Sequence, residues 1–374
     1  METTLSLLDR SLTLQRFPIR KNETLQAWDS ADEYLIHHFE QQQDLSPQHY
    51  LILNDTFGAL SCWFQERSNV TLVTDSFIAK QATEQNLSSN NANPILIQDG
   101  LKALPEADAV MMKLPKSKRL LTWQLIQLCQ ALPDGTIVVT AGKAKDIHTS
   151  TLKLFERYLG KTTTSLAKKK SRLIFTTVDK STSQPLPKPL SWSVDEYHIT
   201  LTNHANVYSG ESLDLGARFI LPHLPKGDKY KHIIDLGCGN GVLTIRLAQL
   251  NPSAKITSID ESYMAITSAT ENCQLNVPDN HNIDLKVNNC LDDFDLNSAD
   301  MVICNPPFHQ QNTITDHIAW QMFNDAYQVL EPNGKLMVIG NSHLKYHEKL
   351  NRLFGNCSKV ASNKKFVIYQ SEKQ

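Results

Sequence analysis

The sequence predicts an α/β protein built from two tandem, duplicated domains, each with a doubly wound, mostly parallel sheet that ends in an antiparallel hairpin. Two observations predict this fold. Short apolar strand patterns alternate with segments of helical spacing throughout the chain. The same motifs also recur in the same order on either side of a polar, proline-rich run at residues 181–195.

Four strand patterns of the first half have counterparts in the second half. Residues 50–55 parallel 232–235, 70–75 parallel 255–260, 107–112 parallel 299–304, and 132–139 parallel 331–338. With 374 residues, of which 41% are hydrophobic, the chain can fill two cores. We therefore expect a first domain at 1–180, a linker at 181–195 and a second domain at 196–374.

A glycine-rich turn in the second half is the first candidate binding site. The strand pattern that ends at Asp235 is followed by Gly237, Gly239 and Gly241, and helical spacing begins at Val242. Glycines let the backbone approach a ligand and adopt positive φ, while a helix N-terminus presents free N–H groups. The ligand group could be a phosphate, as in a dinucleotide-binding oxidoreductase, or a carboxylate.

An acidic residue ends the next strand pattern. Asp260 lies at about the interval expected for the carboxylate that holds ribose hydroxyls in nucleotide sites. The alternative is a solvated helix cap. Since several nucleotide-containing cofactors use an acid here, Asp260 alone does not choose among them.

The tetrapeptide Asn305-Pro306-Pro307-Phe308 follows an apolar strand pattern and indicates a specific chemistry. The amide oxygen of Asn305 and the carbonyl of Pro306 can accept both N–H groups of a planar amine and stabilise positive charge that develops on its nitrogen. The prolines stiffen the peptide. Phe308 offers a face for a base, and such stacking contributes about 1–3 kcal/mol. The alternative is an ordinary Asn-Pro turn followed by a core phenylalanine.

Together, these motifs resemble those of class I methyltransferases that use S-adenosylmethionine to modify amino groups of nucleobases or glutamine. Residues 206–209 and 213–218 resemble the lead-in segment of the ribosomal RNA guanine-N2 methyltransferases. Residues 11–18 and 25–29 resemble the large-subunit (23S) members, the RlmG type, whereas the small-subunit RsmC type shares the catalytic half. The resemblance spans nearly the whole chain and implies a Rossmann-like class I methyltransferase fold for both domains.

The resemblance also implies roles for residues of the second domain. Catalysis would rest on Asn305, Pro306 and Phe308. The residues that would bind the cofactor S-adenosylmethionine are Asp235, Gly237, Cys238, Gly239, Asn240, Gly241 and Asp260, with the adenine ring beside Asn289 and Cys290. Neither Asn289 nor Cys290 is acidic, so an acidic contact to the adenine would have to come from Asp292. The alternative is that residues 289–290 form an ordinary loop.

The first domain has lost these motifs. Residues 55–60 replace the glycine turn with bulkier side chains, and residues 113–116, Lys-Leu-Pro-Lys, replace the Asn-Pro-Pro-Phe tetrapeptide. Basic residues have accumulated instead, and these candidates for RNA binding are Lys113, Lys116, Lys118, Arg119, Lys143, Lys145, Lys168, Lys169, Lys170 and Arg172. The basic residues at 113–119 and at 143–145 should lie near the carboxyl ends of strands, and those at 168–172 should lie in a terminal hairpin turn. Solvated loops are the alternative.

Composition narrows the possible partners. The formal net charge is −2 and the pI is about 6.7, so phosphate binding requires a local basic patch. The seven dispersed cysteines indicate neither disulfides nor a metal site. A signal peptide and a long apolar segment are not evident, so we expect a cytoplasmic protein that binds no membrane and acts as a monomer.

Four functions remain open from the sequence. The favoured one is methylation of guanine N2 in 23S ribosomal RNA, with the target base flipped out. The same activity on 16S RNA, as in the RsmC type, and a non-catalytic RNA-binding assembly factor are the alternatives. Methylation of a protein glutamine uses similar acceptor geometry and is a minority interpretation.

Overall fold

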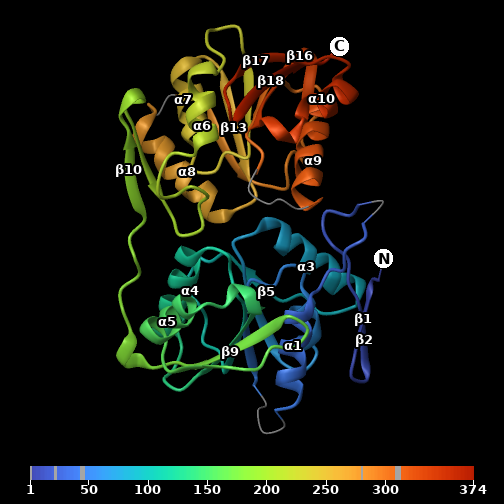
Figure 1. The fold of residues 1–374 in the computed structure, drawn as a ribbon, viewed down its shortest axis with the longest axis vertical. Coiled ribbons are helices and arrows are strands. Elements are labelled where there is room, and N and C mark those ends of the chain that lie inside the picture. Colours follow the sequence, from blue (N-terminus) through green and yellow to red (C-terminus); the bar gives the residue numbers. More distant parts are fainter. Residues whose placement is uncertain (1, 21–22, 43–46, 279–280, 308–312) are drawn as a thin grey trace. The chain divides into compact units, whose positions relative to one another are not determined.

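The chain folds into two compact units, residues 1–188 and 189–374 (Figure 1). The structure is a computed structural model and describes residues 2–20, 23–42, 47–278, 281–307 and 313–374. In each unit the strands form a sheet with helices on both faces (Figure 1).

The first unit begins with a small hairpin that precedes its main sheet. Its elements are β1 (Thr4–Leu7), β2 (Arg10–Thr13), α1 (Ser30–Glu40), β3 (His49–Leu53), α2 (Ala59–Phe64), β4 (Asn69–Val73), α3 (Phe77–Ser89), β5 (Leu96–Gln98), β6 (Ala109–Lys113), α4 (Lys118–Ala131), β7 (Ile137–Lys143), η1 (Ala144–Asp146), α5 (Thr149–Tyr158), β8 (Thr162–Thr164), β9 (Ser171–Thr177) and η2 (Lys180–Thr182).

The second unit repeats this order. Its elements are β10 (Leu190–Val194), η3 (Asp195–Tyr197), β11 (Ile199–Asn203), α6 (Leu215–Ile220), η4 (Leu221–His223), β12 (His232–Leu236), α7 (Val242–Leu250), β13 (Lys255–Asp260), α8 (Tyr263–Asn276), β14 (Ile283–Val287), β15 (Ala299–Cys304), α9 (Thr313–Val329), β16 (Leu330–Asn341), η5 (Ser342–Leu344), α10 (Tyr346–Phe354), β17 (Ser358–Ser362) and β18 (Phe366–Glu372).

The two seven-stranded sheets have the same topology. Their strand orders are β5-β4-β3-β6-β7-β9-β8 and β14-β13-β12-β15-β16-β18-β17. In both, the first five strands pair in parallel and the last two pair antiparallel. The predicted fold, a duplicated α/β domain with a terminal antiparallel hairpin, is confirmed.

The registers of the sheets define which residues are equivalent. His49 pairs with Asn69, and its Nε2 forms a hydrogen bond of 2.8 Å with Thr71 Oγ1. His232 Nε2 forms the same 2.8 Å bond with Thr257 Oγ1. This alignment differs by one residue from the one expected between 70–75 and 255–260. Thr74, and not Asp75, takes the place of Asp260, because each lies two residues before the serine that caps the next helix.

The small hairpins are also equivalent. Asn272 of α8 is fully buried, and its carboxamide bonds both the N–H and the C=O of Thr202, at 2.7 and 3.0 Å. Asn86 of α3 holds Gln15 in the same way, at 2.9 and 2.8 Å. Each asparagine thus binds backbone groups at or just after the second strand of a hairpin and holds them against a helix of its unit.

The hairpin of the second unit shortens the expected linker. Residues 190–194, which fall within the predicted linker at 181–195, form strand β10 and pair with β11. The indole N–H of Trp192 donates to the backbone oxygen of Gly210 at 2.9 Å, and Val194 packs in the core. The second unit therefore begins with a strand at residues 190–194, where the prolines suggested an extended linker.

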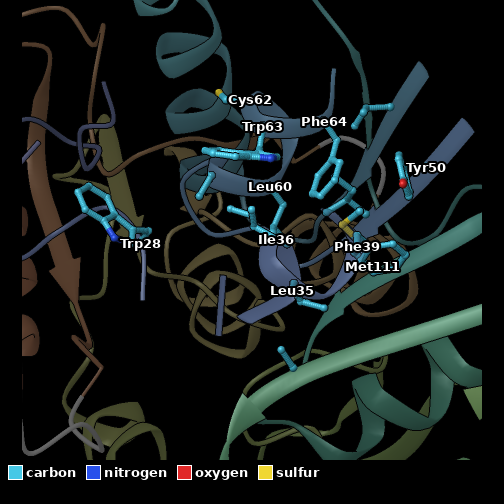
Figure 2. Close-up of a cluster of buried hydrophobic side chains, with 14 of the residues drawn as sticks. Trp28, Leu35, Ile36, Phe39, Tyr50, Leu60, Cys62, Trp63, Phe64 and Met111 are labelled. Atoms are coloured by element: carbon cyan, nitrogen blue, oxygen red, sulfur yellow. The ribbon is translucent and has the colours of Figure 1, made fainter. Parts of the chain in front are cut away.

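Aromatic packing anchors the first sheet (Figure 2). Tyr50 of β3 packs against both Phe39 of α1 and Phe64 of α2, with ring centroids 5.5 and 5.0 Å apart, and the two phenylalanine rings contact each other at 6.2 Å. Trp63 is 1% exposed beside them. Aromatic pairs of this kind contribute about 0.5–1.5 kcal/mol each beyond the area they bury.

We expect Asn272→Ala to lower the stability of the second unit. The substitution leaves the half-buried N–H and C=O groups of Thr202 without these partners, which should cost about 1–3 kcal/mol. Urea denaturation measures the effect, and Asn93→Ala, at an exposed asparagine, is the matched control. An unchanged midpoint for Asn272→Ala would contradict this role.

Candidate active site

A turn between β12 and α7 carries the glycine motif. Gly237, Gly239 and Gly241 have positive φ, at 82°, 54° and 81°. A Cβ on Gly241 would lie 3.0 Å from the Cβ of Ala269, and one on Gly237 would lie 3.2 Å from the Cε of Met322. A Cβ on Gly239 would meet no atom of the described chain within 4 Å. The turn is packed against protein at two glycines and open at the third, which fits close approach of a ligand.

Asp260 ties this turn to the end of β13. Its Oδ2 accepts a hydrogen bond from the backbone N–H of Gly239, and its Oδ1 accepts one from that of Ser262, both at 3.0 Å. Burial raises the pKa of the Asp260 carboxyl. Because each carboxylate oxygen has a second lone pair, Asp260 can still accept hydroxyl groups of a ribose.

The remaining side chains of the motif point into protein. Thr244 Oγ1 donates to Asp235 Oδ2 at 2.7 Å, and burial raises the pKa of Asp235 to about 7. Asn240 donates from Nδ2 to Asn203 Oδ1 at 2.9 Å, and Cys238 is buried. Asn240 and Cys238 can therefore reach a cofactor through their backbone groups.

The segment that follows β14 lies at the same edge of the sheet. The backbone N–H of Asn288 donates to the backbone oxygen of Asp260 at 3.0 Å. Asn289 donates from Nδ2 to Asp292 Oδ2 at 2.7 Å and accepts from Gln321 Nε2 at 3.2 Å, while Cys290 has a φ of 46°. Asp292 thus brings a carboxylate to the segment where the sequence shows no acid at 289 or 290.

Asn305 directly follows β15 and lies beside the glycine turn. Its Oδ1 is buried, and no described residue donates a hydrogen bond to it. Its backbone oxygen would be 3.9 Å from a Cβ on Gly237. A buried acceptor without a partner costs about 1–3 kcal/mol, which an N–H group of a ligand would relieve. Pro306 is buried next to it, whereas Phe308 lies outside the described residues.

Parallel strands bring the motifs together. β12 pairs with both β13 and β15, so the glycine turn, Asp260 and Asn305 all lie at carboxyl ends of adjacent strands. Ligands of doubly wound sheets bind at this edge. These residues fit an S-adenosylmethionine molecule, with Asp260 toward its ribose and Asn305 toward an incoming amine.

Met322 of α9 also borders the site, although no sequence motif includes it. Its Cε lies against the glycine turn, and the Sγ of Cys304 is 4.0 Å from its sulfur. An isolated methionine in a sequence indicates a core residue and not a site. Among the described residues, no group of three His, Cys, Asp or Glu side chains is arranged to hold a metal ion.

The equivalent site of the first unit is closed by an ion pair. By register, Lys113 takes the place of Asn305. Its Nζ lies 2.6 Å from Asp32 Oδ1 and 2.9 Å from Asp29 Oδ1, and the side chains of Lys113 and Asp32 are 13% and 6% exposed. Burial disfavours the ammonium, but the carboxylates of Asp32 and Asp29 outweigh burial and raise the pKa of Lys113 above its usual value. Because Lys113 is a paired cation with a mostly buried side chain, we leave it out of the proposed RNA contacts.

The other basic residues lie at or near the carboxyl edge of the first sheet. Lys143 ends β7 opposite Ser171 of β9, so the hairpin turn with Lys168, Lys169 and Lys170 lies beside it. The exposed members are Lys116, Lys118, Lys143, Lys145, Lys168, Lys169 and Lys170, and Arg119 and Arg172 are half-buried. Lys169 is paired with Glu33 at 2.6 Å. The basic residues at 116–119, 143–145 and 168–172, which are separate in the sequence, thus lie at one edge of the sheet.

Comparisons with known proteins agree with this site. Residues 2–180 match the RLMG N-terminal domain, and residues 198–370 match the methyltransferase small domain. Ribosomal RNA large subunit methyltransferase G of Photobacterium profundum is 58% identical, and that of Vibrio vulnificus is 56% identical, each over 100% of both chains.

A solved structure shares the whole fold. The Thermus thermophilus 16S rRNA N2 G1207 methyltransferase (RsmC), in complex with AdoMet and guanosine, has a TM-score of 0.80 at 20% identity, over 100% of this chain and 98% of that chain.

The fold and the site define a methyltransferase that uses S-adenosylmethionine. The chain belongs to the family of ribosomal RNA large subunit methyltransferase G. The family and the cofactor that the sequence predicted are confirmed.

We expect Lys113→Met and Lys116→Met to separate stability from RNA binding. Lys113→Met leaves Asp32 buried without its partner and should cost about 3–5 kcal/mol of unfolding free energy, measured by urea denaturation. Lys116→Met, at an exposed position, should leave stability unchanged within about 0.5 kcal/mol and weaken RNA binding. Equal stability of the two variants would contradict the structural role of Lys113.

Proposed function

We propose that this enzyme transfers a methyl group to the exocyclic N2 amine of a guanine in 23S ribosomal RNA. The observation that carries the proposal is the buried Oδ1 of Asn305, which no described residue binds, at the edge that carries the glycine turn and Asp260. The target subunit comes from the name of the full-length relatives, which are large-subunit methyltransferases.

In this proposal, Asn305 and Pro306 bind the amine and stabilise the positive charge that develops on its nitrogen. When bound, S-adenosylmethionine would supply an electrophilic methyl group, its sulfur would leave as a neutral thioether, and the surplus proton of the amine would pass to water. Asn305 Oδ1 and the backbone oxygen of Pro306 accept the two N–H bonds, which turns the nitrogen lone pair out of the ring. Because these acceptors are fixed before the reaction, they stabilise positive charge on nitrogen at no cost of reorganisation.

The position of the amine in RNA requires that the base leave its stack. Enzymes that modify bases extrude the target nucleotide into a pocket, at a cost of a few kcal/mol. In this proposal the stacking partner is Phe308, which the sequence suggests and which lies outside the described residues.

The first unit supplies RNA contacts in this proposal. The exposed lysines at the carboxyl edge of its sheet can neutralise phosphates, which makes affinity fall with salt. We assign RNA recognition to residues 1–180 and catalysis to residues 196–374, in a cytoplasmic monomer. Among the described residues, no helix is both long and apolar enough to cross a bilayer.

Mapping the product tests the proposal directly. Ribosomal RNA from cells that lack the protein is treated with enzyme and labelled S-adenosylmethionine, and the nucleosides are identified by mass spectrometry. N2-methylguanosine confined to 23S RNA is the expected result. Label in 16S RNA would move the activity to the small subunit, and absence of label would favour a non-catalytic RNA-binding factor.

We expect Asn305→Ala to slow methyl transfer by about 10²–10³-fold in single-turnover assays, because the charge on nitrogen loses an acceptor. Calorimetry should show S-adenosylmethionine binding within about twofold of wild type, since the cofactor contacts remain. Asn351→Ala, at an exposed residue of α10, is the control. A transfer rate within a few-fold of wild type would refute the acceptor role.

A further inference from the structure

A second asparagine with an unpartnered amide oxygen lies on the strand next to Asn305. Asn341 is the last residue of β16, and its Oδ1 is buried without a hydrogen bond from any described residue. β16 pairs in parallel with β15, whose last residue precedes Asn305. The two carboxamides therefore stand at the carboxyl ends of adjacent strands.

Strand alternation places both side chains on the same face of the sheet. Ile303 and Ile339 contribute to the core cluster beneath α6 and α7, whereas Cys304 and Val338 contribute to the cluster against α9 and α10. Neighbouring residues of a strand point to opposite faces. Asn305 and Asn341 each follow their isoleucine by two residues, so both continue the α6 face.

The register gives their approximate separation. Cys304 pairs with Val338, so Asn305 lies beside Ile339 and Asn341 lies two residues further along. With standard strand spacing and rise, their Cα atoms are about 8 Å apart. A purine whose amine is held at Asn305 can span this distance.

The order of the strands determines where the purine lies. The residues that fit the cofactor are at the ends of β12 and β13, and the sheet continues in the order β13-β12-β15-β16. The methyl donor faces the amine at Asn305 from the β12 side, so the ring extends toward β16. Asn341 borders the ring and not the methyl donor.

The chemistry of a carboxamide matches the guanine edge. Beside N2, guanine presents the N1–H donor and the O6 acceptor, and a carboxamide offers one acceptor and two donors. A buried acceptor that lacks a partner is costly, and pairing with N1–H removes that cost. Building on the proposed function, we propose that Asn341 is a specificity-determining residue that reads N1–H and O6 of the target guanine.

The first unit offers an internal comparison. Lys143 ends β7 and precedes η1 as Asn341 ends β16 and precedes η5. The backbone N–H that follows each residue makes an equivalent bond, from Ala144 to Lys170 at 2.8 Å and from Ser342 to Lys365 at 2.9 Å. The first unit thus has lysine in place of both asparagines, Lys113 for Asn305 and Lys143 for Asn341. Both carboxamides are absent from the copy that has lost the glycine turn.

Substitution of the target base tests this reading of the edge. The substrate is an RNA oligonucleotide that carries the guanine mapped as above, and a second oligonucleotide has 2-aminopurine at that position. 2-Aminopurine keeps the amine but has neither a hydrogen on N1 nor an oxygen on C6. Wild-type enzyme should prefer guanine in kcat/KM by at least about 10-fold, because its site is built for groups that the analogue lacks.

Asn341→Leu, which keeps the volume of the side chain, should reduce kcat/KM for guanine to about the value for 2-aminopurine and leave the latter unchanged. Asn341→Ala is the second variant if the leucine perturbs folding, and Asn351→Leu is the matched control at an exposed site. Calorimetry should show unchanged S-adenosylmethionine binding in all three.

The outcomes separate the two proposals. If Asn341→Leu lowers kcat/KM equally for both substrates, or for neither, the proposed role of Asn341 is overturned. Methylation of guanine by the wild-type enzyme would be unaffected by that result. Wild-type enzyme that methylates neither substrate overturns the proposed function itself.

Discussion

Parallel pairing of β12 with β13 and β15 is the constraint on which the rest of the structure depends. It places the ends of three strands, far apart in sequence, at one edge of the sheet. There the turn at Gly239 binds Asp260, and the backbone of Asn305 approaches Gly237. Neither motif makes a site alone, because the glycine turn has no acceptor for an amine and Asn305 has no place for a methyl donor.

The duplication shows how one scaffold supports two outcomes. Both units keep the strand order, the asparagine that anchors a hairpin and the histidine–threonine contact between central strands. At the position of Asn305, however, the first unit has Lys113, which is closed against Asp29 and Asp32. Where the second unit has a buried acceptor that can bind a ligand, the first unit has an ion pair within the protein. The exposed lysines at this edge of the first unit can still contact a partner.

Much of the fold, and the place of the candidate site on it, could be predicted from the sequence. Apolar strand patterns and the order of motifs gave the duplicated sheet, and the rule that parallel strands end at one edge brought Asp260 and Asn305 together. Three features could not be predicted. The ion pair of Lys113 joins it to Asp29 and Asp32, far away in the sequence, which no local pattern reveals. Strand β10 lies in a segment whose prolines suggested a linker. Asn341 belongs to no motif, and it is distinguished by its place at the end of the strand next to Asn305 together with an amide oxygen that no described residue binds.

The central claim is that the amide oxygen of Asn305, which no described residue binds, accepts a hydrogen bond from the N–H of the target amine. A crystal structure of the enzyme with S-adenosylhomocysteine and guanosine measures this contact directly. The account predicts N2 of guanine at about 2.7–3.2 Å from Asn305 Oδ1. An Asn305 side chain bonded to the protein itself, with the amine held elsewhere, would contradict it.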